Sequence, residues 1–156
     1  LESMRPQPPG TTARKELITL DFRSGEKPTG AAPFAKLLLL EDRTDFQSVL
    51  GDYLVSLCYE LTTASSGSEG VQHVMKRGFD AIICDMMMPK MGGEMFYWAV
   101  TRSRPATRDR FIFFTGHKNN PSLEFFFRRI NARVLYKPFK LSELEAAISD
   151  ILVKVG

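Results

Sequence analysis

Hydrophobic and polar positions alternate between two kinds of segment from Lys36 onward. Short apolar runs typical of strands are separated by longer segments in which apolar residues recur every three or four positions, as in helices. The predicted strands cover residues 37–40, 61–64, 81–84, 111–115 and 134–136. Because each right-handed crossover returns the chain in the same direction, this regular alternation predicts a mostly parallel sheet.

Polar residues mark the starts of the predicted helices. Thr44 with Gln47, and Ser66 with Glu69, have the spacing of capping boxes. A third helix is predicted over about residues 93–103, and a fourth begins at Asn120-Pro121, since Asn suits the N-cap and Pro the first helical position. The apolar stripes of the first, second and fifth helices comprise Phe46, Val49, Leu50, Tyr53, Leu54 and Leu57; Val71, Val74 and Met75; and Leu141, Leu144, Ile148, Ile151 and Val155. Five helices and five strands favour a flavodoxin-like, doubly wound α/β fold with a parallel sheet in the order 2-1-3-4-5.

The composition changes near residue 35. The first 35 residues hold five of the nine prolines and few large apolar side chains, a composition typical of linkers. Within them Ile18, Leu20 and Phe22 alternate with polar residues, as in a half-buried strand. We interpret residues 1–35 as a linker or tail, whose strand-like piece is an added strand or the end of a preceding domain, and residues 36–156 as one domain.

The overall composition narrows the class of protein. The chain has 156 residues, of which 44% are hydrophobic and 25% charged, as expected of one globular domain with a core. Its longest wholly apolar run, Met95 to Val100, is far shorter than the roughly 20 residues of a membrane span, and no secretory leader pattern is present. We therefore expect a cytoplasmic protein with no membrane contact of its own. The net charge is only +3, so nucleic-acid binding by this chain is not expected.

Three carboxylates follow the predicted strands. Glu41 and Asp42 end the first strand and Asp85 ends the third. In the order 2-1-3-4-5 these strands are neighbours about 4.8 Å apart, so the acidic groups converge at one edge of the sheet. Two such charges about 5 Å apart repel by roughly 3 kcal/mol at an effective dielectric constant near 20, which favours a cation between them. Oxygen ligands that leave room for water and phosphate favour Mg²⁺.

A lysine and a hydroxyl complete this edge. Lys137 follows the fifth predicted strand and Thr115 ends the fourth. The flexible lysine stem could reach Asp85 or an anion beside it. A carboxylate nucleophile, a divalent ion, a lysine and a hydroxyl donor are the groups that phosphoryl transfer to an aspartate requires, because negative charge spreads over the transferred oxygens. The residues therefore predict an aspartyl-phosphate site.

These segments resemble the receiver domain of two-component response regulators. The segments that carry the resemblance are LLLLEDRTDF at 37–46, DMMMPKMGG at 85–93, FFTG at 113–116 and YKPF at 136–139. The resemblance implies that Asp85 accepts a phosphoryl group from a phosphohistidine, with Asp42 binding Mg²⁺ directly and Glu41 acting mainly through water. It also implies that the main-chain carbonyl of Met87 completes the metal site.

The same resemblance assigns residues from the other two strands. Lys137 would contact the phosphoryl group, Thr115 would hydrogen-bond to it as the switch residue, and Pro138 corresponds to the family's cis-proline position. Val134 departs from the family, which commonly has Tyr or Phe three residues before the lysine. Tyr136 shares the face of Val134 by strand alternation and is a candidate partial substitute.

Partners and competing functions follow from the resemblance. The expected donor is a histidine kinase or a histidine phosphotransfer domain, and a homodimer would form through the fourth helix, fifth strand and fifth helix. Phe125, Phe126 and Phe127 sweep about 200° of a helix, so at least one of them is expected to be exposed, either under a loop or on such a docking surface. This chain would not be a dedicated enzyme, because it would catalyse only its own phosphorylation and dephosphorylation.

Three alternatives remain at this point. Val134 motivates a receiver-like adaptor that binds partners without phosphorylation. The proline-rich lead favours the receiver segment of a hybrid histidine kinase, and the fold also accommodates flavin enzymes. Glu41 and Asp42 oppose a flavin, because they would repel a phosphate after the first strand. The signal, the cognate kinase, the output partner and the oligomeric state are not specified by the sequence.

Overall fold

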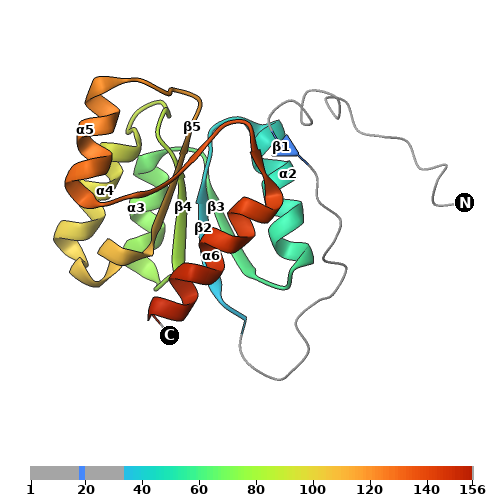
Figure 1. Ribbon diagram of the computed structural model, residues 1–156. Coiled ribbons are helices and arrows are strands. Elements are labelled where there is room, and N and C mark those ends of the chain that lie inside the picture. The colour runs from blue at the N-terminus through green and yellow to red at the C-terminus, as the bar shows by residue number, and fades with distance from the viewer. Residues whose placement is uncertain (1–17, 20–33, 156) are drawn as a thin grey trace, which may run out of the picture.

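The computed structural model describes residues 18–19 and 34–155 (Figure 1). The predicted alternation of strands and helices is present within them. The strands are β1 (Ile18–Thr19), β2 (Lys36–Leu40), β3 (Glu60–Ala64), β4 (Ala81–Asp85), β5 (Phe111–Thr115), β6 (Arg133–Tyr136) and β7 (Phe139–Lys140). The helices are α2 (Thr44–Ser56), α3 (Gly67–Lys76), α4 (Gly93–Ser103), α5 (Pro121–Ile130), α6 (Leu141–Val155) and the short 3-10 helix η2 (Pro105–Arg110).

The main sheet confirms the predicted topology. Its five strands are parallel and lie in the order β3-β2-β4-β5-β6, which is 2-1-3-4-5 when these strands are counted along the chain. Leu40 of β2 pairs with Cys84 of β4, and Thr115 of β5 pairs with Tyr136 of β6. The register therefore brings the carboxyl ends of β2, β4, β5 and β6 to one edge of the sheet. The additional η2 helix is the difference from the five predicted helices.

Helices cover both faces of the sheet. Figure 1 shows α2 and α6 on one side and α3, α4 and α5 on the other. The core of the first side contains Phe46, Leu50 and Leu54 of α2 together with Leu144 and Ile148 of α6. Residues within one strand alternate between the two cores, since Leu37 and Leu39 belong to this one and Leu38 and Leu40 to the other. Burial on both faces explains why the central strands are almost wholly apolar.

The helix starts match the sequence in two of three cases. Asn120 caps α5 by accepting hydrogen bonds from the N–H groups of Ser122 and Leu123, and Ser66 caps α3 through the N–H of Glu69. The predicted capping box of Thr44 with Gln47 is wrong, because α2 has Arg43 at its N-cap and no side-chain cap. Gln47 Nε2 instead donates to the carbonyl oxygens of Glu41 and Ala64, at 2.7 and 3.3 Å.

A second, two-stranded sheet involves the N-terminal segment. Ile18 and Thr19 of β1 pair in parallel with Phe139 and Lys140 of β7. The predicted strand-like piece therefore forms an added strand over these two residues, while its continuation to Phe22 and most of the predicted linker lie outside the described residues. In the described part of the chain, no helix is long and apolar enough to span a bilayer.

The packing of α3 against β2 gives a stability prediction. A Cβ atom added at Gly70 would lie 2.5 Å from Leu40 Cδ2 and 2.8 Å from Phe96 Cε1. Ala is favoured over Gly in an exposed helix by about 1 kcal/mol, but forcing a methyl group into a packed core costs about 1–3 kcal/mol. We therefore expect Gly70→Ala to lower the free energy of unfolding by about 1 kcal/mol in a urea titration.

Gly78→Ala is the matched control for this prediction. A Cβ atom at Gly78 would meet nothing within 4 Å, so this variant should keep the stability of the unmodified chain. Gly70→Ala that is as stable as Gly78→Ala would contradict the close approach of α3 to β2.

Candidate functional site

The three predicted carboxylates meet at the carboxyl edge of the main sheet. Glu41 and Asp42 follow β2, Asp85 ends β4, and carboxylate oxygens of all three lie within 4.8 Å of one another. Glu41 and Asp85 are buried and Asp42 is partly exposed. The strand order accounts for this cluster, because β2 and β4 are hydrogen-bonded neighbours.

Glu41 is a fully buried carboxyl group with one unused oxygen. Its Oε2 accepts a hydrogen bond of 2.9 Å from the N–H of Arg43, whereas its Oε1 has no hydrogen-bond partner. Burial raises the pKa of Glu41 to about 7, with the charge of Asp85 adding to the increase. A buried carboxylate oxygen without a donor is costly, so this site has the electrostatic character of one that accepts a cation.

Asp85 is also buried but has a more open environment. Its Oδ1 accepts a hydrogen bond of 3.3 Å from the N–H of Met87. Burial raises the pKa of Asp85, and the nearby Lys137 ammonium partly opposes that increase. Its carboxyl group lines a cleft of about 430 Å³ that also includes Asp42, Met87, Gly116 and Lys137 among its lining residues.

Lys137 lies between the two buried carboxyl groups. Its Nζ is 3.6 Å from Glu41 Oε1 and 3.8 Å from Asp85 Oδ2. The same Nζ lies 4.6 Å from the ring centroid of Phe46 and 5.0 Å from that of Phe114. Cation–π contacts of this kind favour an ammonium group, so the two rings and the carboxylates together hold the lysine at the cleft.

The other residues predicted for the site lie at the same carboxyl edge of the sheet. Thr115 is fully buried, and its Oγ1 accepts a hydrogen bond of 3.1 Å from the N–H of His117. A Cβ atom at Gly116 would meet nothing within 4 Å, which leaves open space beside the cleft. The side chain of Met87 is exposed, and the Lys137-Pro138 peptide bond is cis, as expected.

On β6, Val134 occupies the position where the family commonly has an aromatic residue, and Tyr136 lies two residues further along the strand. Val134 packs against the core beneath α4 and α5, whereas the Tyr136 hydroxyl donates a hydrogen bond of 3.0 Å to Glu124 on α5. The ring of Tyr136 also lies 5.8 Å from Lys118 Nζ. Tyr136 therefore connects the strand that precedes Lys137 to α5.

The donor set fits a hard divalent cation. Three carboxylates with oxygens within 4.8 Å of one another supply oxygen ligands, and the cluster contains no His or Cys. One of these oxygens is buried and accepts no hydrogen bond. Mg²⁺ is commonly bound through one or two carboxylates while it keeps several waters. The cleft beside Asp85 leaves space for such water ligands or for phosphate oxygens.

The buried Glu41 predicts a pH dependence of stability in metal-free protein. Its usual pKa is 4.5 and its pKa in the folded protein is about 7. Between these values the folded state retains a proton that the unfolded chain has lost. The stability contributed at low pH is therefore lost as the pH rises through the folded pKa, with a limiting slope of about 1.4 kcal/mol per pH unit for one group.

Glu41→Gln should remove this loss. We expect urea titrations in EDTA to show the unmodified chain losing stability relative to Glu41→Gln between pH 4.5 and 7. Glu60→Gln, at an exposed position on β3, serves as the control and should follow the unmodified chain. Parallel pH profiles for Glu41→Gln and the unmodified chain would refute the proposed burial of this carboxyl group.

This parallel α/β fold, with an acidic cluster and a lysine at the carboxyl ends of its strands, defines the class of CheY-like signalling domains. The model of the response regulator receiver domain family matches residues 37–149. The chain belongs to the response regulator receiver domain family, and is thus a receiver domain of two-component signalling.

Similarity to individual proteins is consistent with membership of this family. A probable chemotaxis protein CheY from Rhizobium etli is 27% identical over 117 residues, which cover 74% of this chain and 91% of the relative. The sensor kinase CckA of Brucella abortus is 27% identical over 135 residues, covering 83% of this chain but only 14% of the kinase. Receiver domains therefore occur among its relatives both as nearly whole proteins and as small parts of longer ones.

A solved structure adds a magnesium-bound relative. The receiver domain of sensor histidine kinase PA1611 from Pseudomonas aeruginosa has a TM-score of 0.69 and 25% identity, covering 77% of this chain and 98% of that one. That structure has a magnesium ion coordinated in its active-site cleft. Receiver domains bind Mg²⁺ in an acidic site, and this chain has an acidic cluster at the carboxyl edge of its sheet.

Proposed function

We propose that this chain is a phosphoacceptor receiver in which Asp85 accepts a phosphoryl group from a phosphohistidine. A carboxylate oxygen of Asp85 forms a bond to phosphorus while the bond from phosphorus to the imidazole nitrogen of the donor breaks. The bonding electron pair leaves with that nitrogen. The observation that carries the proposal is Lys137 Nζ within 4 Å of both buried carboxyl groups, at a cleft open to a donor.

The other site residues have distinct roles in this proposal. Asp42, Asp85 and the main-chain carbonyl of Met87 would hold Mg²⁺, with Glu41 acting mainly through water. A bound Mg²⁺ would offset the negative charge of the phosphoryl oxygens. Lys137 would form an ion pair with one phosphoryl oxygen. The hydroxyl of Thr115 would donate a hydrogen bond to another phosphoryl oxygen.

Metal removal tests the function as a whole. With a small acyl phosphate as donor and Mg²⁺ present, we expect intact-protein mass spectrometry to detect one added phosphoryl group, and with excess EDTA we expect none. The reason is that three crowded carboxylates repel a phosphate in the absence of a cation. Equal phosphorylation in EDTA would contradict the proposed magnesium dependence. Slow loss of the label by self-catalysed hydrolysis is also expected.

A second candidate function is a phosphorylation-independent adaptor. It is favoured by Val134, which packs in the core where the family commonly has a movable aromatic ring. Partner affinity with and without the phosphodonor separates the two functions, because an adaptor would bind equally well in both conditions. The switching receiver is preferred because Tyr136 on the same strand already connects the site to α5.

The proposed donor and context follow from the relatives. We propose a histidine kinase or a histidine phosphotransfer domain as the donor, and the receiver of a hybrid kinase as one context, supported by the similarity to the sensor kinase CckA. A histidine kinase takes its phosphate from ATP, so we expect a cytoplasmic location. The domain would span residues 36–156, with 1–35 as a linker or tail.

The proposed docking surface includes helix α5 and its exposed phenylalanine. Of the three phenylalanines on α5, Phe125 is exposed while Phe126 and Phe127 are buried, which confirms that one of them faces outward. We propose that α5, β6 and α6, with Phe125 at their edge, form the surface through which partners or a second copy bind.

A further inference from the structure

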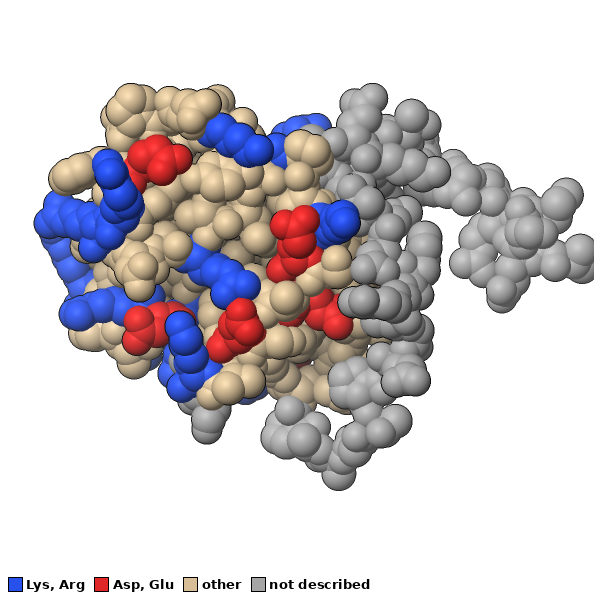
Figure 2. Space-filling view, viewed as in Figure 1, with Lys and Arg blue, Asp and Glu red and all other residues tan. Residues whose placement is uncertain are grey.

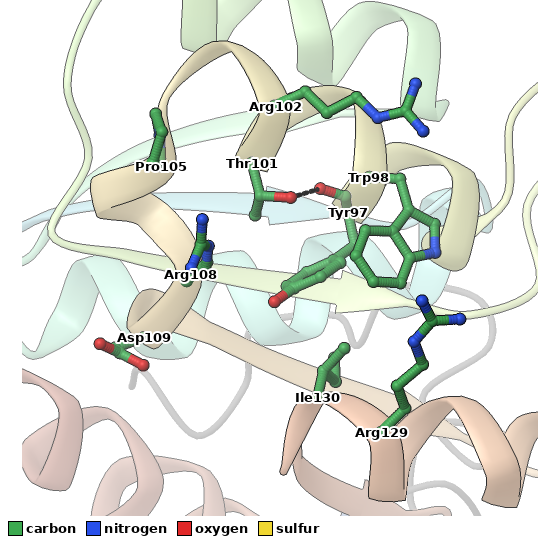
Figure 3. A pocket seen from close by; sticks show the side chains of 9 residues that line it. All are labelled: Tyr97, Trp98, Thr101, Arg102, Pro105, Arg108, Asp109, Arg129 and Ile130. Carbon is green, nitrogen blue, oxygen red and sulfur yellow. Dashed lines mark hydrogen bonds between the residues drawn. The ribbon is translucent and has the colours of Figure 1, made fainter.

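A second pocket lies away from the acidic site, between α4, η2 and α5. Its volume is about 710 Å³, within the range of about 300–1,000 Å³ that is usual for small-molecule sites. Figure 3 shows the side chains that line it, which come from all three helices. None of the residues proposed for the phosphorylation site lines this pocket.

The pocket combines an aromatic wall with unpaired arginines. Tyr97 and Trp98 form part of the wall, and Arg102, Arg108 and Arg129 surround it against a single acidic residue, Asp109. Within residues 34–155 none of the three arginines forms an ion pair with a carboxylate. Figure 2 shows basic side chains gathered on the side of the molecule where Figure 1 places α4 and α5.

Neighbouring arginines are used differently. Arg104 donates to the carbonyl oxygen of Met75 and Arg110 to that of Phe79. Those two hydrogen bonds join each arginine to a main-chain carbonyl of another segment, and neither arginine lines the pocket. The three arginines of the pocket form no such hydrogen bond with any residue that the structure describes, so their guanidinium groups remain available to a ligand.

The Tyr97 hydroxyl is a polar group at the pocket surface with no protein partner among the described residues. The residue is only 3% exposed, and no hydrogen bond is formed by its hydroxyl within the described part of the chain. Figure 3 shows this hydroxyl on the side of the ring that faces Arg108 and Asp109. Burial raises the pKa of Tyr97, with the charge of Arg108 opposing the increase. A neutral hydroxyl donor thus points into a basic pocket.

The indole ring of Trp98 already contacts a planar cationic side chain. The Arg129 guanidinium lies 5.3 Å from the ring centroid of Trp98, so it can stack on the indole while its N–H groups remain available. Arginine binds phosphate oxygens through two parallel hydrogen bonds, and aromatic rings stack on planar bases at about 1–3 kcal/mol each. Together these groups match a ligand with one flat ring system and one or two phosphates.

We propose that the pocket between α4, η2 and α5 binds a nucleoside phosphate. The base packs against the partly exposed Trp98, beside the Tyr97 hydroxyl, and the phosphate accepts hydrogen bonds from Arg108 and Arg129. Inorganic phosphate would leave the exposed part of Trp98 uncovered, and a nucleoside would leave the arginines unpaired. The proposal is independent of phosphorylation at Asp85.

Trp98 provides a direct test because it is the only tryptophan of the chain. The full chain is titrated with AMP and GMP in EDTA, which keeps nucleotide–magnesium complexes from the acidic site, while Trp98 fluorescence is recorded. We expect a saturable change with at least one nucleotide and a binding constant at least about tenfold tighter than for adenosine or pyrophosphate. Asp85→Asn should bind equally well.

Arginine variants distinguish the pocket from general charge attraction. Arg108→Gln and Arg129→Gln should each weaken nucleotide binding about tenfold, the cost of one charge-assisted contact. Arg128→Gln removes the same charge from the adjacent position of α5, outside the pocket, and should change binding less than about twofold. Equal weakening by Arg128→Gln, binding of pyrophosphate as tight as that of the nucleotide, or no saturable signal with either nucleotide would overturn the proposal.

Discussion

Asp85→Asn is expected to abolish phosphorylation by an acyl phosphate in the presence of Mg²⁺. The carboxylate oxygen that would attack phosphorus is lost, and an amide is too weak a nucleophile to replace it. We expect a decrease in the initial rate of at least about 10³-fold, measured by intact-protein mass spectrometry. This is the largest effect predicted for any single substitution in the chain.

Two controls separate chemistry from folding. Asp52→Asn makes the same change at an exposed position on α2 and should be phosphorylated normally. Asp85→Asn should also remain folded, because burial raises the pKa of Asp85 and removing a buried charge relieves that desolvation. Labelling of Asp85→Asn at the rate of Asp52→Asn would refute the assignment of the phosphoacceptor.

Lys137→Ala is expected to lower the phosphorylation rate about 10²-fold, the usual cost of losing one preorganised donor to a transition-state oxygen. The Nζ lies within 4 Å of both Glu41 and Asp85, so its loss also leaves two buried carboxyl groups without a cation. The pKa of each should then rise further, because the lysine charge lowers both at present.

Lys137→Arg should not restore the rate. The rings of Phe46 and Phe114 confine the ammonium group, and a planar guanidinium differs from it in both size and donor geometry. Lys140→Ala, at an exposed position three residues further on, is the matched control and should behave as the unmodified chain. A Lys137→Ala variant with an unchanged rate would exclude a role for this lysine in phosphoryl transfer.

The sequence predicted the sheet and the acidic edge because both follow from local patterns. Continuous apolar runs identified strands buried on both faces, and the strand order then determined that Glu41 and Asp85 meet. The N-cap of α5 was predictable for a similar reason, since Asn120 and Pro121 act within one turn.

The contacts that the sequence did not reveal join distant segments. The capping box at Thr44 was wrong because Gln47 bonds to the carbonyl of Ala64 on β3, a partner that only the folded sheet supplies. The aromatic environment of Lys137 likewise combines Phe46 of α2 with Phe114 of β5. In the sequence, Phe46 lies close to Glu41 and Asp42. That proximity does not show that its ring contacts the ammonium group of Lys137.

The basic pocket was missed for the same reason. Three separate helices bring Trp98, Arg108 and Arg129 together, and no local sequence pattern links these positions. A cluster of arginines in the sequence does not show whether these residues lie on an open surface or line a pocket. That depends on which side chains the fold places next to them.

Chemical trapping of the phosphorylated residue tests the central claim most directly. An aspartyl phosphate is reduced by borohydride to homoserine, so the chain is treated with acyl phosphate and Mg²⁺, reduced and digested, and its peptides are sequenced by mass spectrometry. We expect homoserine at position 85 and none at 42 or 52. Homoserine at another aspartate, or a phosphate that resists reduction and maps to His73 or His117, would contradict that claim.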